Sequence, residues 1–432
     1  MRVWPRGDLW RHPDFLKLWS AQTISQLGSQ VTFLALPLAA ILVLDASTFE
    51  VALVGVFQLL PFLLLALPAG VWVDRLPRRP VLILADIGRA VVLLSLPVAY
   101  WLDALELPHL YLAGFAAGAL TVFFDIAYLS YLPGLVERGQ LLEGNAKLET
   151  TRSAAQVGGP GLAGILVGTL TAPVAILADA LSYAVSALLL GRIKHPERAG
   201  RRRSGPKTSM RRELREGLSF VFRQPYLRIL VLATGGANFF WNIGGGVLIV
   251  YLVRTLDLSP AALGLVLAVG EIGTVVGAVL SGRIARRFGV GRTIVWAALL
   301  ANIGILAVPL APTGRPEPVL MVGFLFGGLF GNVFNVNQLS LRQAITPERL
   351  QGRMNSVVRF MYWGPQPVGM VIGGALGSTV GLRQTLFFAA CGAVLAMVLL
   401  VLNPIRKLEA VPEPPEEPVP SPAVSGTAPE AF

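Results

Sequence analysis

Apolar segments long enough to cross a bilayer recur along almost the whole chain, and they restrict its fold more than any other feature. A helix needs about 20 apolar residues to cross the hydrocarbon core. Charged residues make up only 14% of the chain, whereas a soluble domain carries about 25%. The sequence therefore predicts an all-α membrane protein.

Twelve segments of this kind are predicted, in two sets of six. They cover residues 16–44, 50–73, 80–102, 108–133, 145–170 and 172–191, then 226–253, 260–281, 293–311, 318–341, 354–380 and 382–403. Small and polar residues dilute the fifth and the eleventh. The expected organisation is one six-helix half at 1–191, a central loop at 192–224, a second six-helix half at 225–404, and a tail at 405–432.

The positions of Lys and Arg predict the orientation, because positively charged loops stay in the cytoplasm. Three arginines, Arg89, Arg152 and Arg359, fall well within spans. Of the remaining Lys and Arg residues, only Arg254, Arg315 and Arg383 fall on one side of the membrane, and all the others fall on the side of the termini. Both termini and the central loop are therefore expected in the cytoplasm. The first apolar segment runs to Leu44, which is too long for a cleaved signal peptide. We expect a multi-pass protein of the cytoplasmic (inner) membrane.

The central loop is strongly basic but also carries apolar residues at helical spacing, at Leu214, Leu218, Val221 and Phe222. This pattern is typical of a helix lying on the inner membrane surface. The alternative is a solvated basic linker that follows the positive-inside rule. The proline-rich tail has little to bury and is expected to be disordered.

Composition argues against several function classes. The net charge of +11 comes from short clusters between apolar spans, so no nucleic-acid partner is expected. Cys391 is the only cysteine, which excludes an intrachain disulfide. Two of the three histidines lie outside the predicted spans, and His109 is the second residue of the span 108–133, at its very end. No imidazole is therefore expected deep in the membrane as a base or metal ligand, and neither metal nor cofactor is expected.

A faint internal repeat relates the two halves. At an offset of 207 residues Arg152 corresponds to Arg359, and Pro160 corresponds to Pro367. Each pair falls in the fifth span of its half. Two six-span halves around a site at the middle of the membrane are the arrangement of secondary transporters.

Two motifs make the relationship more specific. The segment GVWVDRLPRR after the second span resembles the cytoplasmic loop motif of the major facilitator superfamily, and GGPGLAG in the fifth span resembles the glycine-proline motif of its proton-coupled drug exporters. Pro77 stands where the loop motif usually has a second glycine. The matching residues are Gly70, Asp74, Arg75, Arg78 and Arg79 in the loop, and Gly159, Pro160 and Gly164 in the span.

Further stretches, such as ISQLGSQVTFLALPL and RRPVLILADIGRA, resemble the subgroup that contains macrolide efflux proteins and the enterobactin exporter. The resemblance implies the major facilitator fold and a secondary active exporter of amphipathic, drug-like compounds, coupled to protons by alternating access. It implies small-molecule, proton and lipid partners, and we expect a monomer. A siderophore or lysolipid cargo is the alternative within the subgroup.

Classes other than transport have less support. A membrane sensor or scaffold would need a docking domain, and only the tail after Asn403 offers one. No Gly-Lys-Ser phosphate loop occurs, so nucleotide-driven transport is not expected. The lack of a buried histidine also argues against an enzyme.

Each motif has a physical interpretation. In the family the acid at Asp74 engages the other half while the inner side is closed, and arginines can hold it by charge-assisted bonds. The bases alone could simply enforce topology. In the fifth span, proline interrupts the backbone bonding and glycine permits close helix approach. That group would shape the cavity wall or serve ordinary packing.

Charges within the spans are the strongest candidates for function, because each costs at least about 2.5 kcal/mol to insert. Asp86 lies roughly 10 Å from the inner end of its span, with Arg89 one turn deeper. With Asp125 and Arg152 they are predicted to form a neutral inner cluster, and Arg359 is a fifth intramembrane charge.

Glu271 differs from these charges because no base lies within a turn of it. It falls at about 16 Å from Pro260, close to the middle of the membrane. A carboxyl there could take and release protons during a transport cycle. It could also be a neutral structural residue or a partner of Arg359. Asp179 is the second proton-coupling candidate, unless it anchors span six among Ser182 and Tyr183.

The expected substrate cavity is mostly apolar and aromatic, with a few polar contacts. The run NFFWNIGGG at the start of the second half is one source of these contacts, or it simply packs. The cavity candidates are Gln22, Gln26, Gln58, Asn238, Trp241 and Asn242.

Overall fold

The computed structural model describes residues 8–73, 75–194 and 210–410, and every regular element in these ranges is helical. In the first half a short turn at Asp8–Arg11 precedes the long helices, and another at Arg138–Gln140 precedes α5. The long helices are α1 (Pro13–Leu42), α2 (Thr48–Val73), α3 (Arg78–Trp101), α4 (Leu107–Leu135), α5 (Leu141–Thr169) and α6 (Ala172–Gly191).

The second half begins with α8 (Pro225–Val250), which continues into a π-helical turn at Tyr251–Thr255. The remaining helices are α9 (Pro260–Phe288), α10 (Val290–Ile305), α11 (Ala307–Leu310), α12 (Glu317–Ala344), α13 (Glu348–Trp363), α14 (Gln366–Thr379) and α15 (Leu382–Val401), and the turn η4 (Pro404–Lys407) follows.

The prediction of an all-α membrane protein is confirmed. Ten helices in the described part of the chain are long and apolar enough to cross a membrane. Adding α5 and the α13–α14 pair gives twelve spans. These two additions correspond to the fifth and the eleventh predicted segments, which small and polar residues dilute.

The eleventh span is two helices rather than one. Helix α13 ends at Trp363 and α14 begins at Gln366, with Gly364 and Pro365 between them. Proline cannot donate a backbone hydrogen bond and its ring clashes with the preceding turn. The matching span of the first half, α5, stays helical through Pro160.

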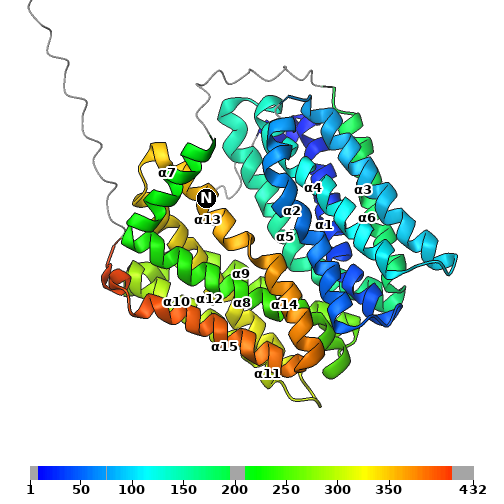
Figure 1. Ribbon diagram of the computed structural model, residues 1–432. Helices are drawn as coiled ribbons and strands as arrows, with labels where there is room; N and C mark the ends of the chain where they lie inside the picture. The colour runs from blue at the N-terminus through cyan, green and yellow to red at the C-terminus, as the bar shows by residue number, and fades with distance from the viewer. Residues whose placement is uncertain (1–7, 74, 195–209, 411–432) are drawn as a thin grey trace, which may run out of the picture.

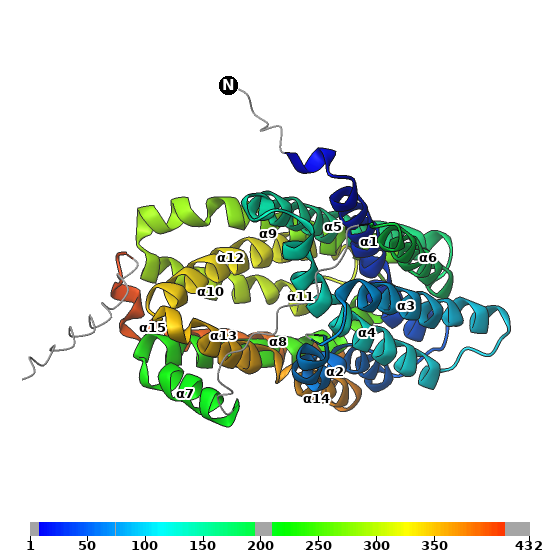
Figure 2. The same ribbon diagram turned by 90° about the horizontal axis from the view of Figure 1, so that it is seen from above.

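The helices form two bundles (Figure 1), with α1–α6 on one side and α8–α15 on the other. Within the first, α1 packs on α5 and α6, and α3 packs on α4 and α6. Within the second, α9 packs on α12, and α8 packs on α14 and α15. The bundles meet mainly through two helix pairs, α5 with α9 and α2 with α14 (Figure 2), and α2 also contacts α8.

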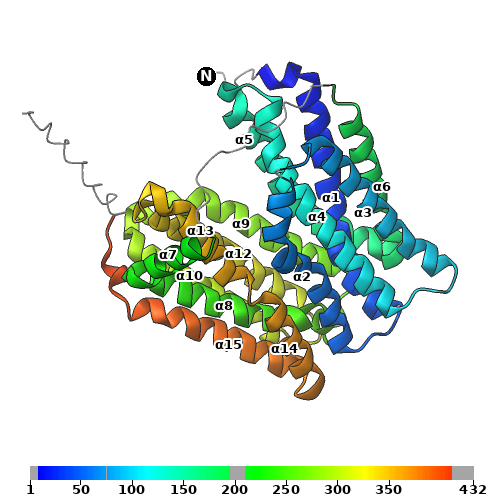
Figure 3. The ribbon, with the colours of Figure 1, turned by 45° about the horizontal axis from the view of Figure 1, so that its top comes forward.

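The bundle has two distinct ends. The basic end carries Arg79, Arg192 and Arg287 at helix termini, and the opposite end carries Asp45 and Arg254. The halves touch at the opposite end, where Arg254 Nη2 lies 2.8 Å from Asp45 Oδ1. Towards the basic end the ribbons of the two halves diverge (Figure 3).

The central loop contains helix α7 (Met210–Arg223), which lies beside α13 at the basic end (Figures 1 and 3). The Glu216 carboxylate pairs with Arg353 and lies 3.3 Å from Arg349 Nη1. Val221 is buried in the core of the second half, while Leu218 is exposed. The rest of the loop, 195–209, lies outside the described residues.

The expectation of a disordered tail needs correction at its start. Residues 404–407 form a 3₁₀ turn with Ile405 fully buried. The carbonyl of Leu408 accepts a hydrogen bond from the Gly291 nitrogen at 2.8 Å. The tail therefore supplies an acceptor to the otherwise unpaired first turn of α10. Residues 411–432 lie outside the described ranges.

Candidate functional site

A cavity of about 890 Å³ lies between the two halves. Helices α1, α2, α5, α8, α9, α10, α12, α13 and α14 all contribute to its wall. Four of the predicted cavity residues line it, together with Pro160 and Glu271; the four are Gln58, Asn238, Trp241 and Asn242.

The placement of Gln22 and Gln26 in the cavity is wrong. The cavity-facing residues of α1 begin one turn later, at Gln30, and continue through Phe33 and Pro37. Gln22 is instead buried within the first half. The helix carries amides over several turns, and only packing decides which of them faces the other half.

Several lining residues were not foreseen. Polar ones gather on the second half, at Thr234, Asn302, Asn335, Gln338, Tyr362 and Gln366. Aromatic ones include Phe33, Phe324, Phe334 and Trp363. The amides of the run NVFNVNQ were a visible signal, because Asn335 and Gln338 share one face of a helix.

Glu271 is the one carboxylate in the described lining. It is half-buried, and no ion pair to it forms within the described residues, so the proposed pairing with Arg359 is not made here. Its neighbours Gly270 and Gly273 pack against the backbone of α12. This tight contact fixes the helix face on which Glu271 points to the cavity.

A buried ionic cluster lies inside the first half, away from the lining. Arg89 donates to Asp86, whose second oxygen accepts from Ser186 Oγ at 2.6 Å. The guanidinium lies 4.3 Å from the Phe124 ring centroid and 4.0 Å from that of Tyr183. Ion pairing, hydrogen bonding and cation–π contact together offset the cost of burying these charges.

Asp179 also lies inside the first half, in the same buried region as Asp86 and Arg89. It is fully buried and accepts hydrogen bonds from Thr32 and, at 3.0 Å, from Ser182 Oγ. The Tyr183 hydroxyl lies 2.8 Å from Ser29 Oγ. Asp179 therefore joins α6 to α1, and it does not line the cavity.

The predicted membership of the buried cluster must be corrected. Asp86 and Arg89 are buried, whereas the side chains of Asp125, Arg152 and Arg359 are exposed. Asp125 still lies within electrostatic reach of all three arginines. Arg152 donates to Glu149 at 2.6 and 3.0 Å, because an acid lies three residues earlier on the same helix face. Arg359 lies 5.0 Å from the ring of Trp363.

The loop motif after α2 is only partly described, since Asp74 lies outside the described residues. Gly70 has open space at its Cβ position, and Arg75 is exposed. Arg79 donates to the carbonyl oxygens of Leu190 and Gly191 at 3.1 and 2.5 Å. A cation at these last carbonyls of α6 is favoured by the helix dipole.

The glycine-proline group of α5 lies at the contact between the halves. A Cβ atom on Gly164 would fall 2.3 Å from the Pro260 carbonyl oxygen, and one on Gly264 would fall equally close to that of Pro160. A Cβ on Gly159 would meet the Gln30 side chain at 2.4 Å. The glycines of the motif thus serve close packing between helices, and Pro160 contributes to the cavity wall, so the structure fits both interpretations of the motif.

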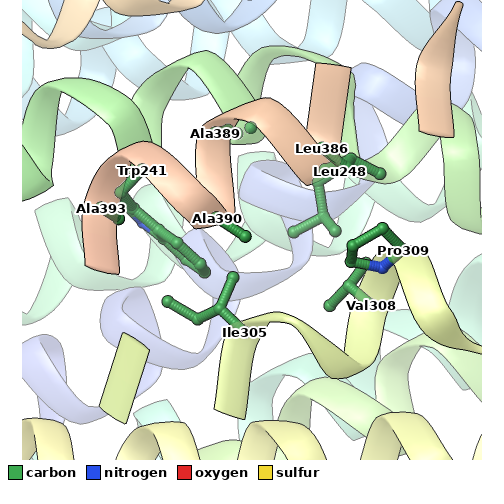
Figure 4. A pocket seen from close by; sticks show the side chains of 11 residues that line it. Trp241, Leu248, Ile305, Val308, Pro309, Leu386, Ala389, Ala390 and Ala393 are labelled. Atoms are coloured by element: carbon green, nitrogen blue, oxygen red, sulfur yellow. The ribbon is translucent and has the colours of Figure 1, made fainter. Parts of the chain in front are cut away.

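A small apolar pocket of about 20 Å³ adjoins the main cavity (Figure 4). Trp241 lies between Ala393 and Ile305, and Leu386 and Val308 line the other side. Its volume is near that of a single water probe. It is too small to hold a drug-sized molecule by itself.

The fold and the cavity define a class of protein. Two helical bundles that touch at one end of a membrane-spanning molecule and enclose a large cavity form the architecture of a secondary transporter. The protein is a multi-pass membrane transporter.

The comparisons give the family. The sequence profile of the family described as transmembrane secretion effector matches residues 9–429. The chain belongs to this family of the major facilitator superfamily.

Relatives and solved structures agree with the family. The multidrug efflux pump Tap of Mycolicibacterium fortuitum is 25% identical and covers 94% of this chain and 99% of its own. The enterobactin exporter EntS of Salmonella typhimurium is 27% identical, and the match covers 93% of this chain and 95% of EntS. An inward-facing bacterial homologue of the iron transporter ferroportin has the same fold, with a TM-score of 0.73 and 19% sequence identity. The match covers 90% of this chain and 98% of the homologue.

Proposed function

We propose that the protein is a secondary active exporter that exchanges protons for amphipathic small molecules by alternating access. The observation that carries this proposal is Glu271, the one carboxylate that the described residues place on the wall of a large and mostly apolar cavity. Ligand cavities of drug-sized compounds span about 300–1,000 Å³, a range that includes this one.

The relatives support export. Tap is named as a multidrug efflux pump and EntS as an enterobactin exporter. If the basic end faces the cytoplasm, as the positive-inside rule predicts, a cavity that is sealed at the opposite end receives its substrate from inside the cell. A siderophore cargo is the second candidate, and the similarity to EntS over nearly the whole chain favours it.

The chemistry of coupling follows from the position of Glu271. A carboxylate that has no ion partner among the described residues and lies in an apolar wall binds a proton at modest cost, and the polar part of a bound substrate competes with that proton. Protonation after the halves have rocked would then favour release of the substrate. Alternation of proton and substrate at one wall is sufficient for antiport.

Proteoliposomes with an imposed pH gradient test this proposal. Substrate flux is followed with a fluorescent amphipathic dye, and proton flux with an entrapped pH indicator. Glu271→Gln is expected to abolish proton-driven dye transport, because the amide cannot carry a proton. Glu106→Gln, which changes an exposed acid at the start of α4, is the matched control.

The result that contradicts the assignment is a folded Glu271→Gln protein that still couples the two fluxes. Asp179→Asn separates the second candidate, because Asp179 lies within the first half and not on the cavity wall. Loss of coupling in Asp179→Asn alone would move the proton site to the buried cluster.

A further inference from the structure

A second polar centre lies beside the cavity, towards the basic end of the second half, and neither the relatives' names nor the proton-coupling proposal assigns it a role. Its central residue is Arg342, in the last turn of α12. The residue is 6% exposed, and its Nε and Nη1 atoms have no hydrogen-bond partner in the described structure. A buried cation in this state is costly and normally has a counter-ion.

No carboxylate among the described residues pairs with Arg342, in contrast to Arg89, which has Asp86. Glu271 is out of reach, although α9 and α12 are neighbours. Gly328 contacts Gly270, and Arg342 follows Gly328 by 14 residues (342 − 328), or about 21 Å of helix.

Three further buried polar atoms, on the neighbouring residues Thr234, Gln338 and Tyr362, have no hydrogen-bond partner in the described structure. The Tyr362 hydroxyl lies close to both Thr234 and Arg342, and the Tyr362 ring is 5.6 Å from the guanidinium carbon. These contacts lack hydrogen-bond geometry, so the Thr234 and Tyr362 hydroxyls stay unpaired, as does Gln338 Oε1. Buried polar atoms are otherwise hydrogen-bonded in more than about nine cases in ten.

These groups border the cavity. Thr234, Gln338 and Tyr362 line it directly, and Arg342 lies one helical turn after Gln338 on the same face of α12. Asn335 completes this face and accepts a hydrogen bond from Gln338 Nε2 at 3.1 Å. Most of the unpaired groups are donors, and the only full charge among them is positive.

We propose that Arg342, with Thr234, Gln338 and Tyr362, forms a subsite for an acidic oxygen group of the substrate. The ligand it fits is an amphipathic molecule whose carboxylate or phenolate is attached to an apolar body. The acidic group binds at Arg342, and the apolar body lies against the aromatic wall of the cavity. The inference rests on the proposed exporter function and narrows its substrate class.

Equilibrium binding to the purified full-length protein tests this subsite. The probes are radiolabelled 2-naphthoate and 2-naphthamide, which share one apolar body and differ in the acidic group. The wild-type protein is expected to bind naphthoate at least about tenfold more tightly, as one charge-assisted contact would give. In Arg342→Gln the preference is expected to fall to about twofold or less.

Two further variants make the result specific. Arg342→Lys keeps the charge but loses the planar fork, so an intermediate preference is expected. Arg287→Gln removes the same charge from the exposed end of α9 and should leave the tenfold preference unchanged. If Arg342→Gln does not fold, the ratio of naphthoate to naphthamide affinity in the wild-type protein and in Arg342→Lys still tests the proposal.

Two outcomes overturn it. One is a wild-type protein that binds the two probes equally or binds neither. The other is a tenfold preference that persists in folded Arg342→Gln. Failure of the exporter proposal is distinguishable, because it appears as absent proton-coupled dye transport in wild-type vesicles, whereas the probe ratio is measured without any gradient.

Discussion

Single charged residues in this protein take different roles according to what surrounds them. Arg89 and Arg342 are both buried, yet Arg89 has a carboxylate and two aromatic rings around it, whereas Arg342 has no counter-ion among the residues that the structure describes. Glu271 has no basic partner among the described residues, and it is only half-buried because it faces the cavity. The contacts of a charge, more than its depth, distinguish the structural charges from the candidates for function.

The Asp86–Arg89 pair gives a prediction at this scale. Arg89→Gln should destabilise the protein by about 3–5 kcal/mol, because Asp86 would remain buried without its cation. The double variant Asp86→Asn/Arg89→Gln removes both members of the pair and should recover part of that loss. Thermal unfolding of the purified variants measures both values, and equal losses in the single and the double variant would contradict the pairing.

At the scale of elements, glycine determines how closely the two halves approach. Gly164 and Gly264 bring the backbones of α5 and α9 into contact, and Gly374 does the same for α14 against Phe49 and Ala52 of α2. Both contacts lie near the opposite end of the bundle. Seals made of backbone contacts are sensitive to a single added methyl group.

Gly164→Ala tests the α5–α9 contact. Its Cβ would fall 2.3 Å from a backbone oxygen, which cannot rotate away. Overpacking of this kind costs about 1–3 kcal/mol, so the sealed state should lose roughly tenfold or more in population. Thiol labelling of Val51→Cys from the opposite end, in a Cys391→Ser background, should accelerate accordingly.

The control for this variant lies on the same helix. Gly158 has nothing within 4 Å of its Cβ position, so Gly158→Ala should leave the labelling rate of Val51→Cys unchanged. Equal acceleration by both alanines would mean that helix propensity, and not the contact between the halves, controls the seal.

At the scale of the whole molecule, transport requires the seal at the opposite end to open. Asp45 and Arg254 pair across the two halves there. Asp45→Cys and Arg254→Cys, joined by a short cleavable bis-thiol reagent in the Cys391→Ser background, should lower dye transport at least about tenfold, since rocking of the halves would be blocked. Cleavage of the reagent should restore the flux.

Single-cysteine variants treated with the same reagent are the control for labelling itself. Undiminished transport by the cross-linked protein would contradict alternating access through this end.

Much of the fold followed from the sequence, while the site followed only in part. Apolar runs of membrane length placed the helices, and even the two diluted segments are the ones that fall outside the apolar criterion in the structure. Trp241 was expected at the cavity and lines it, and Glu271, which was expected near the middle of the membrane, lines it as well. Arg152 was expected in the buried cluster, but its partner Glu149 lies on its own helix. Gln22 was expected in the cavity and is buried instead.

The sequence by itself determined that this protein resides in a membrane, where its helices lie and how its halves are related. These properties depend on composition and on patterns within single segments. Only the tertiary structure decided which face of each helix meets the cavity, because that depends on how the bundles pack. It separated the paired charges from the unpaired ones for the same reason. Asp86 and Ser186, or Arg342 and Tyr362, become neighbours only when distant helices meet.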